Sequence, residues 1–360
     1  MQEFYCKTKI ISGDGALDWL KGRKCRQLLV VTDPFFAENG WAADIAGRVQ
    51  AEKRTYFSKV QPDPKVEQAA EGTALMRQLQ PDLLIALGGG SAMDTAKAMV
   101  YFAGEGITFV AIPTTSGSGS EVTDFSVLTH GDEKHPLIDK RMQPDVAIVA
   151  AELVEKLPPA LVADGGFDVL SHAAESFVAT GADPMTQALA GSAFSAAFAC
   201  LPASFRGDTR VRGKMHLAST MAGVAFSQSG LGMCHALSHS LGGVFHIPHG
   251  RLNAILLPEV IACNSAAAAG DYAKLARMAG LGSSADTLGV RNLRSGLIRL
   301  RKELHLPATL KEAGVDPKVL WHHRDRILQT ALKDPCMATN PVRGESFLMG
   351  RVLEAVAGRG

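Results

Sequence analysis

The stretch PDLLIALGGGSAMDTAK, residues 81–97, decides the fold of this 360-residue chain. It begins as a short apolar run typical of a buried strand and passes through three glycines into a helical pattern. Glycines after a strand allow a tight turn and let the backbone approach a ligand closely. Ser91 or Asp94 can cap this helix, so that its positive end faces the loop and suits a pyrophosphate. A loop with a purely structural role is the alternative, because GGGS is not the GxGxxG fingerprint.

Comparable apolar runs lie on both sides of this stretch. They cover residues 27–33, 108–113 and 146–149. Helical spacing separates them, notably over residues 63–80 and 92–102. Strands that alternate with helices predict βαβ units and a mostly parallel sheet. We therefore expect an α/β nucleotide-binding domain over residues 1–157.

A second loop of small residues, PTTSGSGSE at 113–121, follows the apolar run at 108–113. Its hydroxyls and amides suit phosphate and ribose groups, although a flexible linker has the same composition. Two such loops at the carboxyl ends of neighbouring strands favour nucleotide binding, because open α/β sheets bind nucleotides at that edge. Asp33 ends an earlier strand and can accept hydrogen bonds from a ribose, and its charge favours NAD over NADP. Asp33-Pro34 is also a common turn pair.

The composition excludes several classes of partner. The chain is 46% hydrophobic and 20% charged with a formal net charge of +1, so neither a polyanion nor an anionic membrane surface is an expected partner. No uninterrupted apolar run approaches the roughly 20 residues of a membrane span. The start, MQEFYCKTKI, has no signal-peptide pattern, and the first eighteen residues favour a strand over a targeting helix. We expect a cytoplasmic protein whose six scattered cysteines are reduced thiols.

The pattern changes after residues 157–159, Leu-Pro-Pro. From there the chain is rich in alanine and leucine and has helical spacing with almost no strand-like alternation. The clearest helical segments are residues 188–198, 215–226, 272–278 and 293–304. We expect an all-α domain over residues 158–360.

Four of the eleven histidines fall within GLGMCHALSHSLGGVFHIPHG, residues 230–250. His235 and His239 are four residues apart and project from one face of a helix. His249 lies in Pro-His-Gly, where proline ends a helix and glycine permits a close backbone approach. Neutral imidazoles suit a divalent transition metal, although a helix with incidental histidines is the alternative. Cys234 points about 100° away from His235 on a helix, so we assign it no role.

The first helix of the second half adds two further candidate ligands. Asp168 and His172 are again four residues apart, and this pair can bind one metal ion or form a solvent-exposed ion pair. Together with His235 and His249 they make a set of one carboxylate and three imidazoles. Most of their sequence neighbours are small and apolar, and an unpartnered polar group is costly in such surroundings.

These motifs, taken together, resemble one family, the iron-containing alcohol dehydrogenases. The matching segments are GGGSAMDTAK (88–97), PTTSGSGSEVT (113–123), Gly-x-Asp-x-x-x-His (166–172), His-x-x-x-His (235–239), Pro-His-Gly (248–250) and DPCMATNP (334–341). They occur in the family's order and span nearly the whole chain. The resemblance implies NAD(H) bound in a cleft of a two-domain, dehydroquinate synthase-like fold. It also implies a metal held by Asp168, His172, His235 and His249, with Fe²⁺ expected and Zn²⁺ or Mn²⁺ suited to the same donors.

The resemblance also implies roles for individual residues. His239 matches a histidine that relays a proton or contacts the substrate, whereas helix packing is the alternative role. The expected cofactor-binding residues are Asp33, Gly89, Gly90, Ser91, Asp94, Thr114, Thr115, Ser118 and Lys134. The chain departs from the family at Ala150-Ala151, where Asp-Pro is usual, at Ser118, where threonine is common, and at Phe167, where methionine is more usual. Phe167 adjoins the metal-binding helix, and we expect it to shape the substrate pocket.

The expected activity is a metal-dependent, NAD(H)-linked interconversion of short-chain primary alcohols and aldehydes, such as 1-propanol and propanal or ethanol and acetaldehyde. Residues 212–216, 225–228 and 245–250 resemble the branch of the family found in propanediol-utilising bacterial microcompartments. This likeness implies aldehyde reduction that regenerates NAD, a homo-oligomer, and microcompartment shell or lumen enzymes as partners.

Three alternatives differ in chemistry. A glycerol or diol dehydrogenase would have the same fold. A metal-loaded, non-enzymatic microcompartment component would show no turnover of NADH. A dehydroquinate synthase-type lyase would need a lysine and arginine cluster for a sugar phosphate, and the sequence has none near Asp168, His172 and His235.

Overall fold

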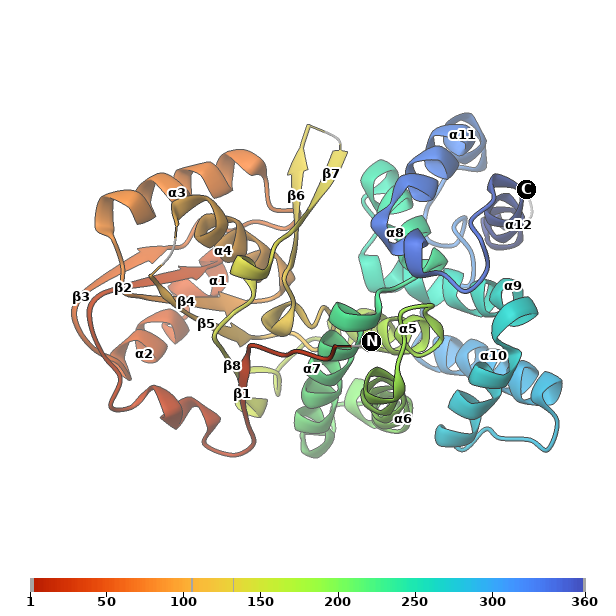
Figure 1. The fold of residues 1–360 in the computed structure, drawn as a ribbon, viewed down its shortest axis with the longest axis horizontal. Helices are drawn as coiled ribbons and strands as arrows, with labels where there is room; N and C mark the ends of the chain where they lie inside the picture. The colour runs from red at the N-terminus through yellow and green to blue at the C-terminus, as the bar shows by residue number, and fades with distance from the viewer. Residues whose placement is uncertain (1–2, 105, 132, 359–360) are drawn as a thin grey trace. The chain divides into compact units, whose positions relative to one another are not determined.

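The computed structural model describes residues 3–104, 106–131 and 133–358. The chain divides into two compact units, one of Tyr5–Leu157 and one of Pro158–Gly360 together with Met1–Phe4, and each is described by itself. In Figure 1 the first unit runs from red to yellow and the second from yellow-green to blue.

The first unit is built on a six-stranded sheet with the order β1-β8-β5-β4-β2-β3, in which every neighbouring pair is parallel. The strands are β1 (Lys9–Ser12), β2 (Lys24–Thr32), β3 (Gln50–Phe57), β4 (Leu83–Gly88), β5 (Thr108–Pro113) and β8 (Val146–Val149). All six residues of β4 are buried, as its uninterrupted apolar run predicts. The expected parallel sheet is confirmed.

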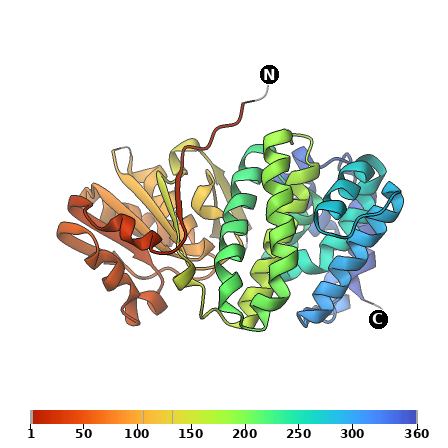
Figure 2. The ribbon, with the colours of Figure 1, turned by 90° about the horizontal axis from the view of Figure 1, so that it is seen from below.

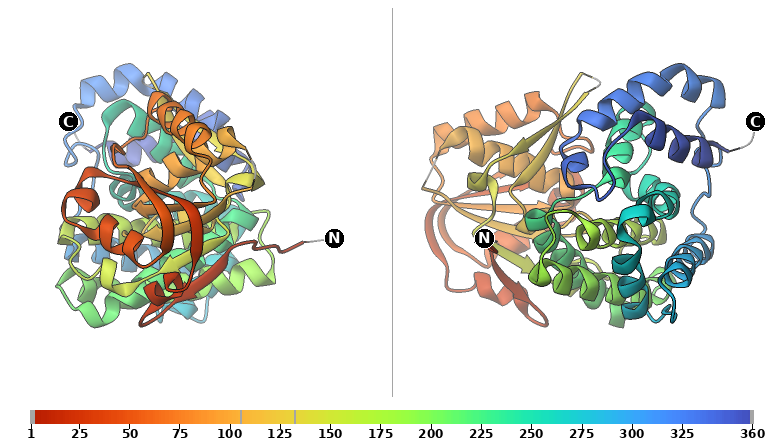
Figure 3. Two further views of the ribbon diagram at one scale, coloured as in Figure 1. Left: turned by 90° about the vertical axis from the view of Figure 1, so that its left-hand side faces the viewer. Right: turned by 45° about the vertical axis from the view of Figure 1, so that its right-hand side comes forward.

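Helices cover both faces of this sheet because side chains alternate along each strand. Leu28 and Val30 of β2 face a core with the 3₁₀ helix at Ala16–Leu20 and with α2 (Trp41–Gly47). Leu29 and Val31 face the opposite core, formed with α3 (Val66–Leu79) and α4 (Gly90–Ala103). Figure 3 shows the twisted sheet of this unit from the side.

Two features of the first unit lie outside the expected pattern. Five of the eight residues of β3 are exposed and three consecutive ones, Glu52-Lys53-Arg54, are charged, so this strand lacks the apolar run that marks the other strands. A separate antiparallel hairpin joins β6 (Phe125–His130) and β7 (Glu133–Ile138). The short helix α1 (Pro34–Glu38) follows β2 directly.

The second unit consists of helices and connecting loops within the described residues. Its α-helices are α5 (Pro159–Val178), α6 (Pro184–Phe205), α7 (Arg212–Ser229), α8 (Met233–Phe245), α9 (His249–Met278), α10 (Asp286–Glu303), α11 (Pro317–Lys333) and α12 (Ser346–Ala357). The expected all-α architecture is confirmed. The expected segment 272–278 is only the end of α9, which kinks at Ala268.

The helix α5 lies at the centre of this unit. It packs against α6, α7 and α9, and Figure 2 shows α5, α6 and α7 running side by side. Sixteen of its twenty residues are buried, Phe167 among them. A Cβ at Gly166 would lie 2.2 Å from Leu201 of α6, so this glycine permits the close packing of the two helices.

Two helices of the second unit, α6 and α9, are long and apolar enough to cross a membrane by length and composition alone. The apolar window of α9 is 61% buried within the unit, where the helix covers α5. Its composition is therefore accounted for by a core position.

Candidate metal centre and cofactor loops

Asp168 and His172 lie one turn apart on the same face of α5, as their spacing predicts. Both are buried, with 8% and 5% of their surface exposed. The Oδ1 atom of Asp168 lies 4.0 Å from Nδ1 of His172. On its other side, the His172 ring stacks on Phe226 of α7 with the ring centroids 4.4 Å apart.

The helix α8 brings His235 to this face of α5. Its first residue is Met233 and its N-cap is Gly232, so His235 lies in the first helical turn. The rings of His172 and His235 stack with centroids 4.4 Å apart and planes 18° apart. Burial lowers the pKa of His235 well below its ordinary value, and neighbouring histidines lower it further. The ring is therefore neutral near pH 7, the form that binds a metal.

His249 comes from the start of α9, with Pro248 as the N-cap. Its Nε2 atom lies 3.6 Å from Oδ1 of Asp168, and its ring centroid lies 5.2 Å from that of His235. The Pro-His-Gly segment thus begins α9, whereas α8 has already ended at Phe245 with His246 as its C-cap, so the expectation that this proline ends a helix is wrong. A Cβ at Gly250 would lie 1.9 Å from the carbonyl oxygen of Asp164, so the close backbone approach expected of this glycine is present.

The structure thus brings together all four residues that the sequence suggests as metal ligands. Donor atoms of Asp168, His172 and His235 lie within 4.8 Å of one another, and Asp168 lies 3.6 Å from His249. Tetrahedral ligands bound at about 2.1 Å are separated by about 3.4 Å, so small side-chain movements would complete the coordination. Burial raises the pKa of Asp168, while His172 and a hydrogen bond from Asn253 lower it. One carboxylate and three imidazoles therefore fit a divalent transition metal.

Glu175 is a site residue that the sequence interpretation missed. It is 1% exposed, and its Oε2 lies 2.6 Å from Nδ1 of His235. Burial raises the pKa of Glu175 to about 7, although hydrogen bonds from backbone amides lower it. A signal was present in its spacing, because Glu175 follows His172 by three residues and Asp168 by seven and so shares their helical face.

His239 lies one turn beyond His235 and stacks on His249, with ring centroids 5.0 Å apart. Its Nδ1 atom lies 2.8 Å from Oδ2 of Asp334, which precedes the 3₁₀ helix Pro335–Thr339. Burial raises the pKa of Asp334, but hydrogen bonding to His239 and the histidine's charge outweigh it, and the pKa is lowered. A second group of potential metal ligands consists of His239, Asp334 and Cys336. Two of them, His239 and Asp334, are already hydrogen-bonded to each other.

The first predicted loop joins β4 to α4, but its helix is not capped as expected. Gly89 is the N-cap residue, and no described side chain makes a capping hydrogen bond. Ser91 and Asp94 are the expected caps, and both expectations are wrong because α4 begins at Gly90, two residues earlier than a Ser91 cap allows. The Asp94 carboxylate instead accepts hydrogen bonds from Ser120 Oγ at 2.9 Å and from the backbone of Val127.

The second loop lies against the first. The Thr114 amide donates to the carbonyl of Gly88 at 3.0 Å. A Cβ at Gly89 would lie 3.2 Å from Oγ1 of Thr115, and one at Gly90 would lie 3.4 Å from the side chain of Ser118. The residues that the sequence assigns to the two loops therefore form one surface at the carboxyl ends of β4 and β5.

Asp33 caps α1 by accepting a hydrogen bond from the Phe36 amide at 3.1 Å. Asp33-Pro34 therefore begins a helix, with Asp33 as its N-cap and Pro34 at its first position. Its other oxygen lies 3.6 Å from the position of a Cβ at Gly88, so the carboxylate also adjoins the first loop. Lys134 belongs to β7, and its side chain lies outside the described residues.

Lys97 is a second buried charge that the sequence interpretation missed. Its Nζ donates to Ser120 Oγ at 2.9 Å, to Thr123 Oγ1 at 2.8 Å and to the carbonyl of Phe125 at 2.7 Å. Burial lowers the pKa of Lys97 to about 8, although nearby carboxylates raise it. The lysine thus fixes the chain that follows the second loop to α4.

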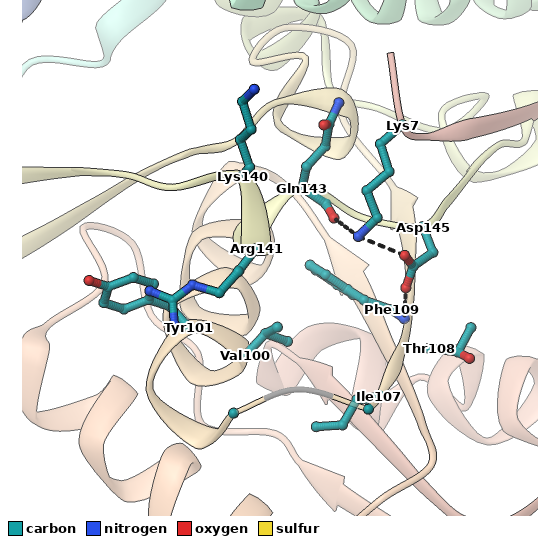
Figure 4. A pocket seen from close by; sticks show the side chains of 12 residues that line it. Lys7, Val100, Tyr101, Ile107, Thr108, Phe109, Lys140, Arg141, Gln143 and Asp145 are labelled. Carbon is teal, nitrogen blue, oxygen red and sulfur yellow. Dashed lines mark hydrogen bonds and ion pairs between the residues drawn. The ribbon is translucent and has the colours of Figure 1, made fainter. Parts of the chain in front are cut away.

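A cavity of about 580 Å³ lies at the opposite edge of the sheet, where β5 and β8 begin (Figure 4). Lys7 pairs there with Asp145 at 2.7 Å, and Arg141 lies over the ring of Tyr101. Two of the three cations that line the cavity, Lys7 and Arg141, are therefore already engaged, and we assign the cavity no ligand.

Two family models match most of the chain. Residues 7–151 match "Iron-containing alcohol dehydrogenase", and residues 162–356 match "Fe-containing alcohol dehydrogenase family, C-terminal". Among curated relatives, 1-propanol dehydrogenase PduQ of Citrobacter freundii is 41% identical, with 98% of this chain and 99% of the relative covered. NADPH-dependent butanol dehydrogenase of Clostridium saccharobutylicum is 37% identical, with 99% and 98% covered.

Solved structures agree with these matches. A 1,3-propanediol oxidoreductase superposes with a TM-score of 0.92 at 27% identity, covering 99% of this chain and all of the other. The sulfoacetaldehyde reductase of Bifidobacterium kashiwanohense, solved in complex with NAD⁺, gives a TM-score of 0.89 at 26% identity, with both chains fully covered.

Proposed function

The chain belongs to the iron-containing alcohol dehydrogenase family, and we propose on this premise that it is a metal-dependent, NAD(H)-linked dehydrogenase of short-chain primary alcohols. The observation that carries the proposal is the convergence of one carboxylate and three imidazoles on α5, α8 and α9. A fourth imidazole, His239, lies beside them.

In this proposal Asp168, His172, His235 and His249 hold the metal, with Fe²⁺ as the family's ion and Zn²⁺ or Mn²⁺ compatible with the same donors. A divalent ion bound there acts as a Lewis acid toward the substrate oxygen. Three of the four ligands, Asp168, His172 and His235, are buried, whereas the His249 side chain is 32% exposed, so the protein shields the site from water on the side of α5 and α8. Low exposure strengthens electrostatic interactions at the reacting oxygen.

His239 is the proposed proton carrier. The Nδ1–H group of His239 donates a hydrogen bond to Asp334, which leaves Nε2 as the nitrogen that exchanges a proton with the substrate oxygen. In alcohol oxidation His239 accepts this proton, and in aldehyde reduction it returns it. The side chain is 21% exposed, so the proton can pass on to water.

The two small-residue loops at the carboxyl ends of β4 and β5 are proposed to bind the dinucleotide. Gly89, Gly90 and Ser91 would lie against its pyrophosphate, with the hydroxyls of Thr114, Thr115 and Ser118 nearby. Asp33 adjoins the first loop and would repel a 2′-phosphate, which supports NAD(H) over NADP(H). The butanol dehydrogenase relative, in contrast, is named NADPH-dependent.

The proposed substrates are C2–C4 aldehydes and alcohols, with aldehyde reduction regenerating NAD. The relatives named for 1-propanol and butanol support this range. We further propose a cytoplasmic homo-oligomer that works with shell or lumen enzymes of a microcompartment. The close fit to a 1,3-propanediol oxidoreductase supports diols as the second candidate substrate class.

The test is NADH oxidation with propanal, using metal-free protein before and after anaerobic addition of Fe²⁺, Zn²⁺ or Mn²⁺. We expect one metal to restore turnover and His249→Ala to abolish it. Preference for glycerol or 1,3-propanediol over propanol would favour the diol candidate. No turnover with any metal, despite bound NAD, would refute the dehydrogenase assignment for these substrates.

A further inference from the structure

The carboxylate of Glu175 makes four hydrogen bonds, all of them to the start of α8. Its Oε1 accepts from the amide of Cys234 at 2.6 Å. Its Oε2 accepts from the amides of Gly232 at 3.0 Å and His235 at 3.3 Å, and from the ring Nδ1 of His235 at 2.6 Å. One buried side chain on α5 therefore contacts both the backbone and a candidate ligand of α8.

We propose that Glu175 is a positioning residue that prepares His235 to bind the metal. It does so by fixing the tautomer of the imidazole and by holding the start of α8 against α5. This inference rests on the metal site of the proposed function and extends it to a residue that binds no metal itself.

The tautomer follows from the chemistry of the partner. Both oxygens of Glu175 already accept hydrogen bonds from backbone amides, as a carboxylate acceptor does, so we assign the short contact to the Nδ1–H group of His235 donating to Oε2. The lone pair then resides on Nε2. That atom lies 3.5 Å from the side-chain nitrogen of Asn253, which donates to Oδ1 of Asp168 at 2.8 Å. Glu175 thus directs the ligating nitrogen of His235 toward the same place as the carboxylate of Asp168.

The position of α8 follows from its unusual N-terminus. The first amides of a helix have no partner within the helix, and a side chain of the N-cap residue commonly accepts from them. The N-cap of α8 is Gly232, which has no side chain, and Glu175 accepts in its place. A Cβ at Gly232 would lie 2.9 Å from Oε1 of Glu175, so glycine gives the carboxylate access to these amides.

Asn340 provides a matched comparison at the same helix start. Its Oδ1 accepts from the amide of Met233 at 3.0 Å and from Asn264 at 2.9 Å. Its side-chain nitrogen donates to Asn264 and to the carbonyl of Val342. None of these described hydrogen bonds reaches a candidate metal ligand. Asn340 therefore anchors α8 without orienting His235.

The experiment compares Glu175→Gln, Asn340→Ala and His172→Ala with the wild-type chain. Metal-free protein is titrated with Co²⁺ and Zn²⁺ in competition with a chelator, and the ligand-field spectrum of bound Co²⁺ is recorded. Thermal unfolding of the metal-free forms measures how far each change disturbs the fold. Glutamine has the shape of glutamate, but it lacks the charge and turns an N–H group toward an N–H donor.

We expect Glu175→Gln to weaken metal affinity by about 10- to 100-fold and to alter the Co²⁺ spectrum. We expect Asn340→Ala to destabilise the metal-free protein while its affinity stays within about threefold of wild type. If Glu175→Gln does not fold, Glu175→Asp replaces it, since the shorter carboxylate keeps its charge but cannot reach the ring and the amides together. The expected loss of affinity is then about tenfold.

The outcomes separate the inference from the function on which it rests. If His172→Ala loses the metal but Glu175→Gln binds it like the wild type, the positioning role is refuted and the metal site stands. Equal losses of affinity in Glu175→Gln and Asn340→Ala would reduce Glu175 to an anchor of α8 and refute its role in orienting His235. If the wild type binds no metal, or if His172→Ala binds it unchanged, the metal site and the inference both fail.

Discussion

Gly250→Ala tests whether the close contact of α5 and α9 sets the position of His249. The added methyl group would lie 1.9 Å from the carbonyl oxygen of Asp164, whereas ordinary contact begins at 3.4 Å. The obstacle is backbone rather than a flexible side chain, so the two helices must separate locally by about 1.5 Å. The adjacent His249 would move away from Asp168, its neighbour at 3.6 Å.

The expected cost has two parts. Overpacking of this kind lowers the free energy of unfolding by about 1–3 kcal/mol. Misplacing a group at the site by about 1 Å lowers the rate by about 100-fold. We therefore expect kcat/KM for propanal to fall by about two orders of magnitude and metal affinity to weaken with it.

The matched control is Gly242→Ala in the neighbouring helix α8. A Cβ there would lie 3.6 Å from Leu252, which is ordinary contact. Alanine is favoured over glycine inside a helix by about 0.5–1 kcal/mol, so this variant should be neutral or slightly more stable. Urea unfolding, chelator competition and steady-state kinetics on both variants make the comparison. A Gly250→Ala enzyme that matches Gly242→Ala in all three would refute the steric reasoning.

Three further predictions follow from single contacts. Because the buried Lys97 has a pKa of about 8 against 10.5 when unfolded, the folded state binds fewer protons between these pH values. The free energy of unfolding should therefore rise with pH across this window by up to about 3 kcal/mol, and this gain should be lost as the pH falls through 8. Urea unfolding of Lys97→Met should not show this rise. Equal pH dependence of the unfolding free energy in the variant and the wild type would contradict the prediction. Asp33→Asn keeps an acceptor for the Phe36 amide but removes the charge, so the ratio of kcat/KM for NADPH to that for NADH should increase by about tenfold, and an unchanged ratio would exclude charge repulsion. Asp334→Asn should lower kcat by about 100-fold at unchanged metal content, because the amide no longer fixes the His239 tautomer, and a normal kcat would leave His239 without a role in proton transfer.

The parallel sheet was predictable wherever burial makes a strand uniformly apolar. The runs at 108–113 and 146–149 match β5 and β8 to the residue. In contrast, β3 has one buried residue among eight and polar side chains at most of the other positions, because most of the strand faces solvent. Its place at the sheet edge comes from pairing with β2, which no local pattern encodes.

The candidate site also contains residues that the sequence could predict and residues that it could not. The pairs Asp168–His172 and His235–His239 were recognisable because a helix converts a spacing of four into a shared face. Glu175 was not recognised because its partners lie about 60 residues away, and three of them are backbone amides, which are identical for every residue type. The cap of α4 was mispredicted because local propensity favours serine or aspartate, whereas the turn after β4 places glycine there.

The burial of α5 also constrains how such an enzyme can change over evolutionary time. Sixteen of its twenty residues are buried, and the same helix carries Asp168, His172 and Glu175. A substitution that alters the pocket from α5 therefore also alters the folding core, so selection for a new substrate would work against selection for stability. Adaptation would have more freedom at Pro335–Thr339, a 3₁₀ helix that contains no buried residue, whereas the preceding Asp334 must stay to hold His239. We expect natural variants with different substrate ranges to differ in that segment while α5 stays nearly constant.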